Sequence, residues 1–153
     1  MGARLGGQRC TCFVPHGHWR SSTLVLALRH DRLCAPWVID GSMNGSAFLT
    51  YVKEHLAPEL NAGDIVICDN LASHKVSGVA QAIEERGAQI VYLPPYSPDL
   101  NPIEMAFAKL KASLRQAAQR TLEGLLEAVA TALKSFSPDH CANFFRHAKY
   151  ATN

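Results

Sequence analysis

The stretch DIVICDNLASHK, residues 64–75, is the strongest indication of the fold. Ile65, Val66, Ile67 and Cys68 form a continuous apolar run, which is typical of a strand buried on both faces of a sheet. The run ends at Asp69, an acid placed where the strand leaves the core. Ligands of open α/β sheets bind beyond the carboxyl ends of the parallel strands, so Asp69 is a candidate site residue.

The segments around this strand predict one α/β domain with a mixed sheet. Upstream, we expect a short extended segment over 9–17 and an antiparallel ribbon of two strands, over 21–31 and 34–41. Downstream, a second strand over 88–93 stops at two prolines. The spacing of apolar residues and the capping residues predict helices over 44–60, 76–87, 103–118 and 121–136, with a short one from 137.

The composition is that of an ordinary globular protein, with 48% apolar and 18% charged residues in 153 positions. No apolar run is long enough to span a membrane, and no signal peptide is recognisable. The odd number of cysteines, five, favours reduced thiols in a cytoplasmic protein. Cys10, Cys12, His16 and His18 lie close together, but their spacing fits none of the common structural zinc sites.

Two segments of the chain are basic, although the net charge is only +2. Residues 1–30 contain four arginines, Arg29 among them, and no acid, and residues 105–122 contain four basic residues and no acid. In the second segment, Lys111 and Arg115 form a stripe on the helix face that carries Glu104. Such a surface suits a polyanion such as DNA, and solvated surface charge is the alternative.

A second acid, Glu104, follows the next strand. It stands in the first turn of the helix that Asn101 caps and Pro102 begins. Asp69 and Glu104 can therefore meet at one edge of the sheet, and two such carboxylates favour a divalent cation such as Mg²⁺. The alternative is structural: a strand-end Asp is often a helix cap, and Glu in a first turn is favoured by the helix dipole.

The motifs VICDNLASHK and YLPPYSPDLNPIE strongly resemble the DDE transposases of the mariner-like superfamily, in its bacterial insertion-sequence branch. The interval between Asp69 and Glu104, residues 70–103, is 34 residues long, which is the spacing in that family between the second and third catalytic acids. PHGHWRSSTLVLALRHD and APWVIDGSMNG also look like this branch, so the resemblance covers nearly the whole chain.

The resemblance implies an RNase H-like fold and metal-dependent cleavage of DNA at transposon ends, followed by joining to target DNA. Asp69 and Glu104 are then the catalytic and metal-binding acids, with Mg²⁺ or Mn²⁺ as cofactor. The residues assigned to DNA binding are Asn70, His74, Lys75, Lys111 and Arg115. For His74, positioning of Asp69 or a structural hydrogen bond are alternatives. The implied partners are DNA and either an N-terminal transposase chain or further copies, in a bacterial cytoplasm near the nucleoid.

The chain departs from the family where the first catalytic acid belongs. That acid lies on the first, central strand, whereas residues 1–30 have no acid, and Asp31 and Asp40 have the wrong place in strand order. We therefore expect residues 1–153 to be a partial catalytic domain that lacks the central strand and is inactive alone. The alternative is a non-catalytic DNA-binding or assembly fragment. A hydrolase with Asp69 as nucleophile is disfavoured, because no D-x-D pattern ends a strand.

Overall fold

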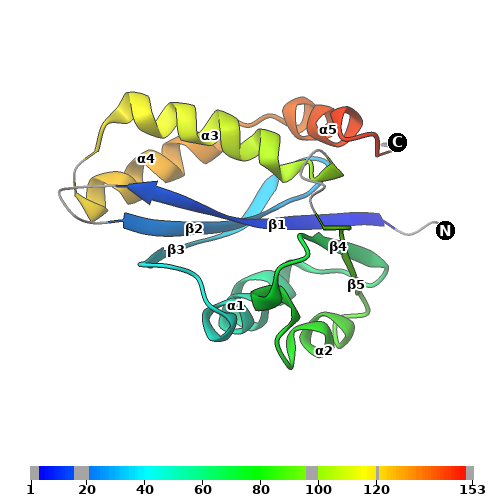
Figure 1. Ribbon diagram of the computed structural model, residues 1–153. Coiled ribbons are helices and arrows are strands. Elements are labelled where there is room, and N and C mark those ends of the chain that lie inside the picture. Colours follow the sequence, from blue (N-terminus) through cyan, green and yellow to red (C-terminus); the bar gives the residue numbers. More distant parts are fainter. Residues whose placement is uncertain (1–3, 16–20, 96–99, 120, 151–153) are drawn as a thin grey trace.

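The computed structural model describes residues 4–15, 21–95, 100–119 and 121–150, and contains a five-stranded mixed sheet (Figure 1). The order of the strands in the sheet is β3-β2-β1-β4-β5. Strands β1–β2 and β2–β3 pair antiparallel, whereas β1–β4 and β4–β5 pair parallel. The strands are β1 (Arg4–Pro15), β2 (Ser21–Leu28), β3 (Leu33–Asp40), β4 (Asp64–Cys68) and β5 (Gln89–Tyr92).

The expectation that the sheet lacks its central strand is wrong. β1 is a 12-residue strand that lies between β2 and β4. The sequence pattern predicted only a short extended segment over 9–17, whereas the strand in the structure begins at Arg4 and includes Gly6 and Gly7. In the structure the β1–β4 register shifts between Leu5 and Gln8, so the two glycines fall at an irregularity within a continuing strand. β1 contains no Asp or Glu.

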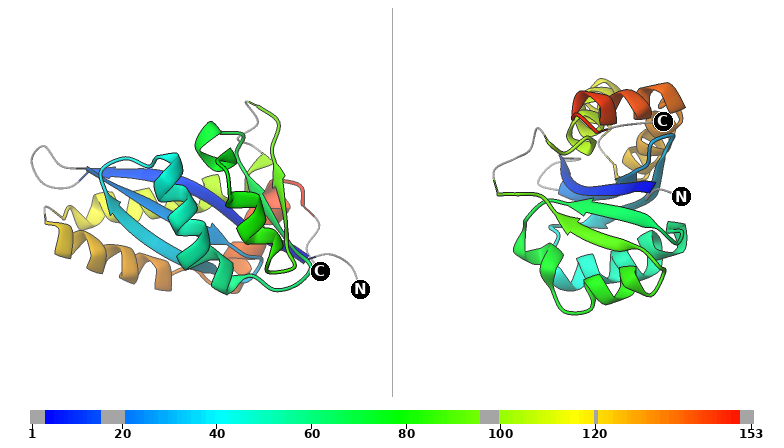
Figure 2. Two further views of the ribbon diagram at one scale, coloured as in Figure 1. Left: turned by 90° about the horizontal axis from the view of Figure 1, so that it is seen from below. Right: turned by 90° about the vertical axis from the view of Figure 1, so that its right-hand side faces the viewer.

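Helices cover both faces of the sheet (Figures 1 and 2). Below it lie α1 (Gly45–Tyr51), which continues through a π-helical turn η1 (Val52–Leu56) and a 3₁₀ turn η2 (Ala57–Glu59), and then α2 (Val79–Glu84). Above it lie α3 (Ile103–Ala117), α4 (Leu122–Lys134) and α5 (Pro138–His147). A short 3₁₀ helix, η3 (Ala72–Lys75), follows β4. None of the helices in these ranges is long and apolar enough to cross a membrane.

Two apolar clusters, one on each face, hold the layers together. The side chains of β2 alternate between them: Leu24, Leu26 and Leu28 face α3, α4 and α5, whereas Val25 and Ala27 face α1 and α2. Because β2 is buried on both faces, it reads as a continuous apolar run rather than an alternating one. In β4, Val66 and Cys68 both pack in the lower cluster.

Cys34, Cys68 and Cys141 are buried, and none of these three cysteines forms a disulfide. Burial raises the pKa of Cys34 and of Cys141 to about 11, so both stay protonated at neutral pH and neither is suited to nucleophilic chemistry. The side chains of Cys10 and Cys12, and residues His16 and His18, lie outside the described part of the structure.

Arg29 and Asp64 form an ion pair inside the domain. Arg29 follows the end of β2 and Asp64 begins β4, and the two guanidinium nitrogens donate to the two carboxylate oxygens at 2.9 and 3.0 Å. Both side chains are buried, with 3% and 0% exposure. Hydrogen bonding to Asp64 raises the pKa of Arg29 above its usual value. The sequence places Arg29 in a basic segment suited to DNA. In the structure Arg29 is buried and does not contribute to a basic surface.

Candidate active site

The carboxyl end of β4 is fixed by hydrogen bonds to the main chain. Asp69 follows β4, and its carbonyl oxygen accepts from the Leu71 amide at 2.9 Å and from His74 Nδ1 at 2.9 Å. His74 in turn is held against the Phe48 ring, 4.8 Å between centroids, and its own carbonyl accepts from the Tyr92 hydroxyl at 2.9 Å. His74 thus connects the turn that carries Asp69 to α1, through Phe48, and to β5, through Tyr92.

Asn101 links Asp69 to the start of α3. Its side-chain amide donates to Asp69 Oδ1 at 2.6 Å, and its side-chain oxygen accepts from the Ile103 amide at 3.3 Å. Its carbonyl accepts from the Glu104 amide at 3.1 Å. The residue that was expected only to cap the helix thus contacts both segments that carry the candidate acids. This side chain is buried, with 2% exposure.

Asp69 and the start of α3, the helix that carries Glu104, lie at the same edge of the sheet for a topological reason. Cys68 of β4 is paired in register with Tyr92 of β5, so both parallel strands end together. Asp69 follows the first of these strands, and the loop after the second leads to Glu104 in the first turn of α3. Asp69 and Glu104 are both half-buried. This is the arrangement expected of a ligand site at strand ends.

Asp69, Asn70 and Glu104 carry side-chain oxygen atoms, the donor type that a small divalent cation prefers. Asp69 and Glu104 carry carboxylates, and Asn70 Oδ1, on the residue after Asp69, is buried and has no hydrogen-bond partner. Mg²⁺ and Mn²⁺ prefer oxygen donors, and Mg²⁺ is commonly held by one or two carboxylates with water and substrate phosphates. No group of three or more His, Cys, Asp or Glu residues lies together in the described ranges, so further oxygen ligands are needed for a complete site.

The residues assigned to DNA binding differ in exposure. Lys111 and Arg115 are exposed on α3, and Lys75 is exposed with its Nζ atom 5.3 Å from the centre of the Tyr92 ring. His74 is only 1% exposed. The expectation that it contacts DNA is therefore corrected: the His74 ring is enclosed, and its hydrogen bond positions the Asp69 main chain.

Lys109 of the basic segment contacts residues of its own domain rather than extending into solvent. Its Nζ atom lies 2.9 Å from His140 Nδ1 and 4.7 Å from the centre of the Phe136 ring, so it joins α3 to α5. The exposed cations of α3 are then Lys111 and Arg115, seven and eleven residues after Glu104, on the same helix face.

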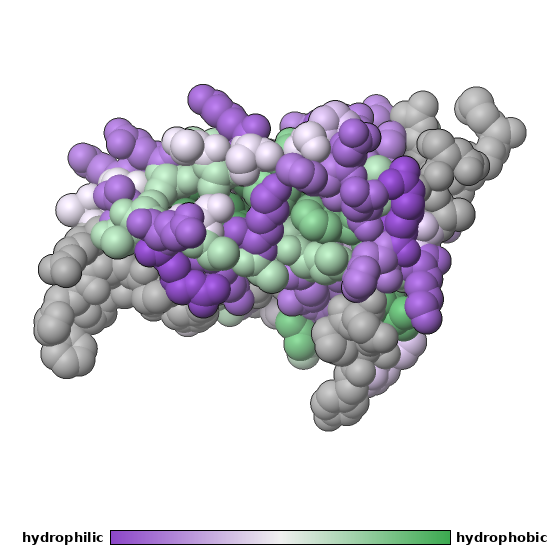
Figure 3. Space-filling model, turned by 90° about the horizontal axis from the view of Figure 1, so that it is seen from above, coloured by the Kyte–Doolittle hydropathy of each residue, from purple (hydrophilic) through white to green (hydrophobic). Residues whose placement is uncertain are grey.

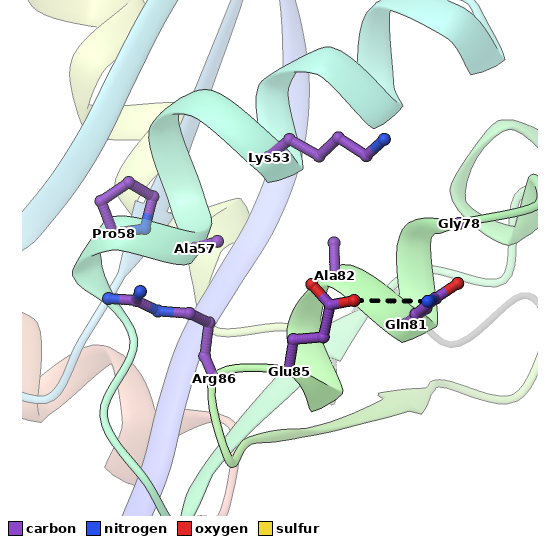
Figure 4. Close-up of a pocket in the computed structure, with 8 residues that line it drawn as sticks. All are labelled: Lys53, Ala57, Pro58, Gly78, Gln81, Ala82, Glu85 and Arg86. Atoms are coloured by element: carbon purple, nitrogen blue, oxygen red, sulfur yellow. Dashed lines mark hydrogen bonds between the residues drawn. The ribbon is translucent and has the colours of Figure 1, made fainter.

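A cavity of about 400 Å³ on the opposite side of the sheet lies apart from these residues (Figure 4). It is lined by the segment from Lys53 to Pro58 and by α2 with its flanks, where Gln81 donates to Glu85 at 3.3 Å and Arg86 stands nearby. Its charges are of both signs, and none of the candidate site residues borders it.

We expect replacement of Asn101 by alanine to destabilise the domain by about 1–3 kcal/mol, because its partners at Asp69 and Ile103 lose a buried hydrogen bond. Urea unfolding followed by circular dichroism measures the change. The matched control is Asn143→Ala on α5, an exposed asparagine for which we expect a change below about 0.5 kcal/mol. Equal effects of the two substitutions would remove the special role of Asn101.

The chain matches a family model and several solved structures. The model describes a DDE superfamily endonuclease and matches residues 2–125. The catalytic domain of Mos1 transposase with raltegravir and Mg is 13% identical with a TM-score of 0.78, covering 93% of this chain and 77% of that one. The same domain with raltegravir and Mn gives 13% identity and a TM-score of 0.76, covering 93% and 76%.

A larger assembly shows the same likeness. In a pre-cleavage Mos1 transpososome, the matching chain is 14% identical with a TM-score of 0.71. The match covers 95% of this chain but only 52% of that one. At such identities the likeness establishes the fold, which is the RNase H-like fold of the Mos1 catalytic domain. A sequence comparison with curated proteins gave no match.

Proposed function

The chain belongs to the DDE superfamily endonucleases, and on this basis we propose that residues 1–153 are part of the catalytic domain of a mariner-like DDE transposase from a bacterial insertion sequence. The proposed reaction is metal-dependent cleavage of DNA at transposon ends and joining of the freed 3′-hydroxyl to target DNA. The observation that carries the proposal is the contact of Asn101 with both Asp69 and the start of α3, at the edge where parallel strands end.

Asp69 and Glu104 are the proposed metal-binding acids. A bound Mg²⁺ or Mn²⁺ supplies positive charge that offsets the charge developing on the reacting phosphate. The chain's own contribution is to hold the two carboxylates still. Asn101 restrains Asp69 through its side chain, and His74 restrains the main chain of the same residue. Positioning of this kind matters because a displacement of about 1 Å can lower a rate about 10²-fold.

The proposed path of DNA runs from these acids along α3. Lys111 and Arg115 are exposed on the face that begins with Glu104, and Lys75 stands beside β5, so their charges can contact successive phosphates. Asn70 lies next to Asp69, and its side-chain NH2 group, which can donate to a phosphate oxygen, is the fourth proposed contact. One of the solved structures with a chain similar to this one is a pre-cleavage transpososome of Mos1. By analogy, transposon ends, target DNA and further transposase chains are the proposed partners, in a bacterial cytoplasm.

A second candidate function is supported by the composition of β1. The strand in the central position has no carboxylate between Arg4 and Pro15, so the first catalytic acid of the family has no counterpart there. A chain that binds DNA and assembles with other subunits but does not cut DNA fits this observation. The two candidates differ in whether the protein nicks DNA when Mg²⁺ or Mn²⁺ is added.

The proposal is tested by binding of Mn²⁺ to the purified chain, measured by calorimetry or electron paramagnetic resonance. Asp69→Asn and Glu104→Gln are each expected to weaken binding about tenfold or more, which corresponds to about 1.4 kcal/mol. Asp139→Asn and Glu123→Gln are matched controls, because both acids are exposed in the first turns of α5 and α4. If all four variants bind Mn²⁺ equally, the metal site is not at Asp69 and Glu104.

A further inference from the structure

A cavity of about 460 Å³ lies beside the candidate site, between the start of α3 and the end of α5. Asn101, Glu104 and Met105 line one side of it, and His147 and Lys149 line the other. Glu104 is thus shared between the candidate metal site and this cavity. The two walls are more than forty residues apart in sequence, so the cavity exists only in the folded chain.

The end of α5 is held firmly at this place. The Tyr150 hydroxyl donates to the Leu100 carbonyl at 2.8 Å, which joins the segment after α5 to the residue before Asn101. The Tyr150 amide donates to the Phe145 carbonyl at 2.9 Å, and the two rings meet edge to face at 6.1 Å. Phe145 is fully buried. His147 and Lys149 are therefore carried on a segment anchored at both ends.

Lys149 has a left-handed backbone conformation, with φ at 71°. An L-residue other than glycine pays about 1–2 kcal/mol for this conformation. The local hydrogen bonds that retain it run from the Lys149 amide to the Arg146 carbonyl at 2.9 Å and from the Ala148 amide to the Phe144 carbonyl at 3.2 Å. Strained residues of this kind often lie at functional sites, so the turn is worth testing.

The Lys149 ammonium group at this cavity is not part of an ion pair among the described residues. His147 and Lys149 are exposed, and the ion pairs among the described residues, which involve Arg29 and Arg32, include neither of them. Figure 3 views the α3–α4–α5 face and shows hydrophilic residues at both ends of it, including the right-hand end, where α5 and the start of α3 lie. A DNA strand that brings a phosphate to Glu104 is repelled by that carboxylate, and nearby cations offset the repulsion.

We propose that Lys149, with His147, binds a phosphate of the DNA strand next to the phosphate that is cut, and so positions the strand against Glu104. This inference rests on the proposed function for its substrate, and it adds a contact point outside the stripe on α3. Lys149 is a positioning residue here: it holds the backbone of the substrate and takes no part in the reaction at the cut phosphate. The apolar part of Met105, itself 37% exposed, offers a surface for the adjoining sugar.

The test is the salt dependence of DNA binding by the purified chain, with a nicked 30-base-pair duplex of arbitrary sequence as probe and Ca²⁺ in place of the catalytic metal. Lys149→Gln removes the charge, and glutamine meets the same strain as lysine in the left-handed backbone conformation. It is expected to lower the slope of log affinity against log salt concentration by about 0.9, the value of one phosphate contact on duplex DNA. Lys149→Arg is expected to restore the slope, because it restores the charge.

Arg146→Gln is the matched control, because Arg146 is exposed near the end of α5, three residues before Lys149, but does not line the cavity. It is expected to leave the slope unchanged. Equal slopes for the original chain and Lys149→Gln, or equal losses in Lys149→Gln and Arg146→Gln, would overturn the inference while leaving metal binding by Asp69 and Glu104 intact. A Lys149-dependent slope in a chain that binds no Mn²⁺ would support the inference and reject the proposed metal site.

Discussion

Replacement of Arg29 by methionine is expected to lower the free energy of unfolding by about 3–5 kcal/mol. The substitution leaves the Asp64 carboxylate buried without the two hydrogen bonds from Arg29, at 0% exposure. The hydrogen bond to that carboxylate from the Asn61 amide, at 2.8 Å, does not neutralise its charge. For a domain of this size, whose total stability is typically about 5–15 kcal/mol, such a loss is a large fraction. Urea unfolding measures it.

Arg32→Met is the matched control. Arg32 also pairs with acids, Asp31 at 3.4 Å and Glu59 at 3.8 Å, but these groups are 42–49% exposed. An exposed ion pair contributes only about 0–1 kcal/mol, so the control is expected to unfold at nearly the original urea concentration. Replacing both partners, as Arg29→Met with Asp64→Leu, should recover much of the loss, since no unpaired charge is then buried. Similar effects of Arg29→Met and Arg32→Met would show that the buried pair is not important for stability.

The second large effect concerns catalysis: we expect purified residues 1–153 to perform no measurable strand transfer with Mg²⁺ or Mn²⁺. A two-metal reaction on phosphate needs carboxylates that fix both ions, and β1 supplies none. The absent ligand is expected to lower the rate by at least about 10²-fold, through misplacement of the reacting groups. The assay is joining of a radiolabelled 3′-end to plasmid DNA. Robust joining by this chain alone would mean that Asp31, Asp40 or an acid of another copy completes the site.

The register of the sheet also predicts where an added acid should restore metal binding. Arg9 of β1 is paired with Cys68 of β4, so the next position of β1, Cys10, is opposite Asp69. Cys10→Asp is therefore expected to strengthen Mn²⁺ binding and to raise metal-dependent nicking of supercoiled DNA. Thr11→Asp, which adds the same charge one position further along β1, is the control and is expected to do neither. If the two variants behave alike, the third carboxylate of the site does not come from β1.

Much of the architecture followed from the sequence alone. The unbroken apolar run from Ile65 to Cys68 is visible without a structure, because a strand buried on both faces has no polar positions. The helical periodicity of α3 and the turn residues before it also identified the place of Glu104 correctly in the first turn of that helix. Such signals are local: they depend on residues within one or two turns of each other.

The central strand was missed because its signal is not local. Gly6 and Gly7 weaken the pattern of β1, and the strand is completed by pairing with β2 on one side and β4 on the other. Neither neighbour is adjacent to the glycines in sequence. A strand of this kind is stabilised by the hydrogen-bonding groups of its partners, which outweigh the low strand preference of glycine.

The sequence by itself determined the α/β class and the two acids that end or follow parallel strands. Only the tertiary structure decided how the polar residues around them are used. Three polar residues of the sequence are of the kind that binds DNA, but in the structure each has a partner within the domain. Arg29 pairs with Asp64, His74 hydrogen-bonds to the Asp69 main chain, and Lys109 contacts His140 of α5. Asn101 shows the converse, since its contact with Asp69 crosses 32 positions. The reason is physical: a buried polar group must find a partner, and the fold, not the spacing along the chain, determines which partners are within reach.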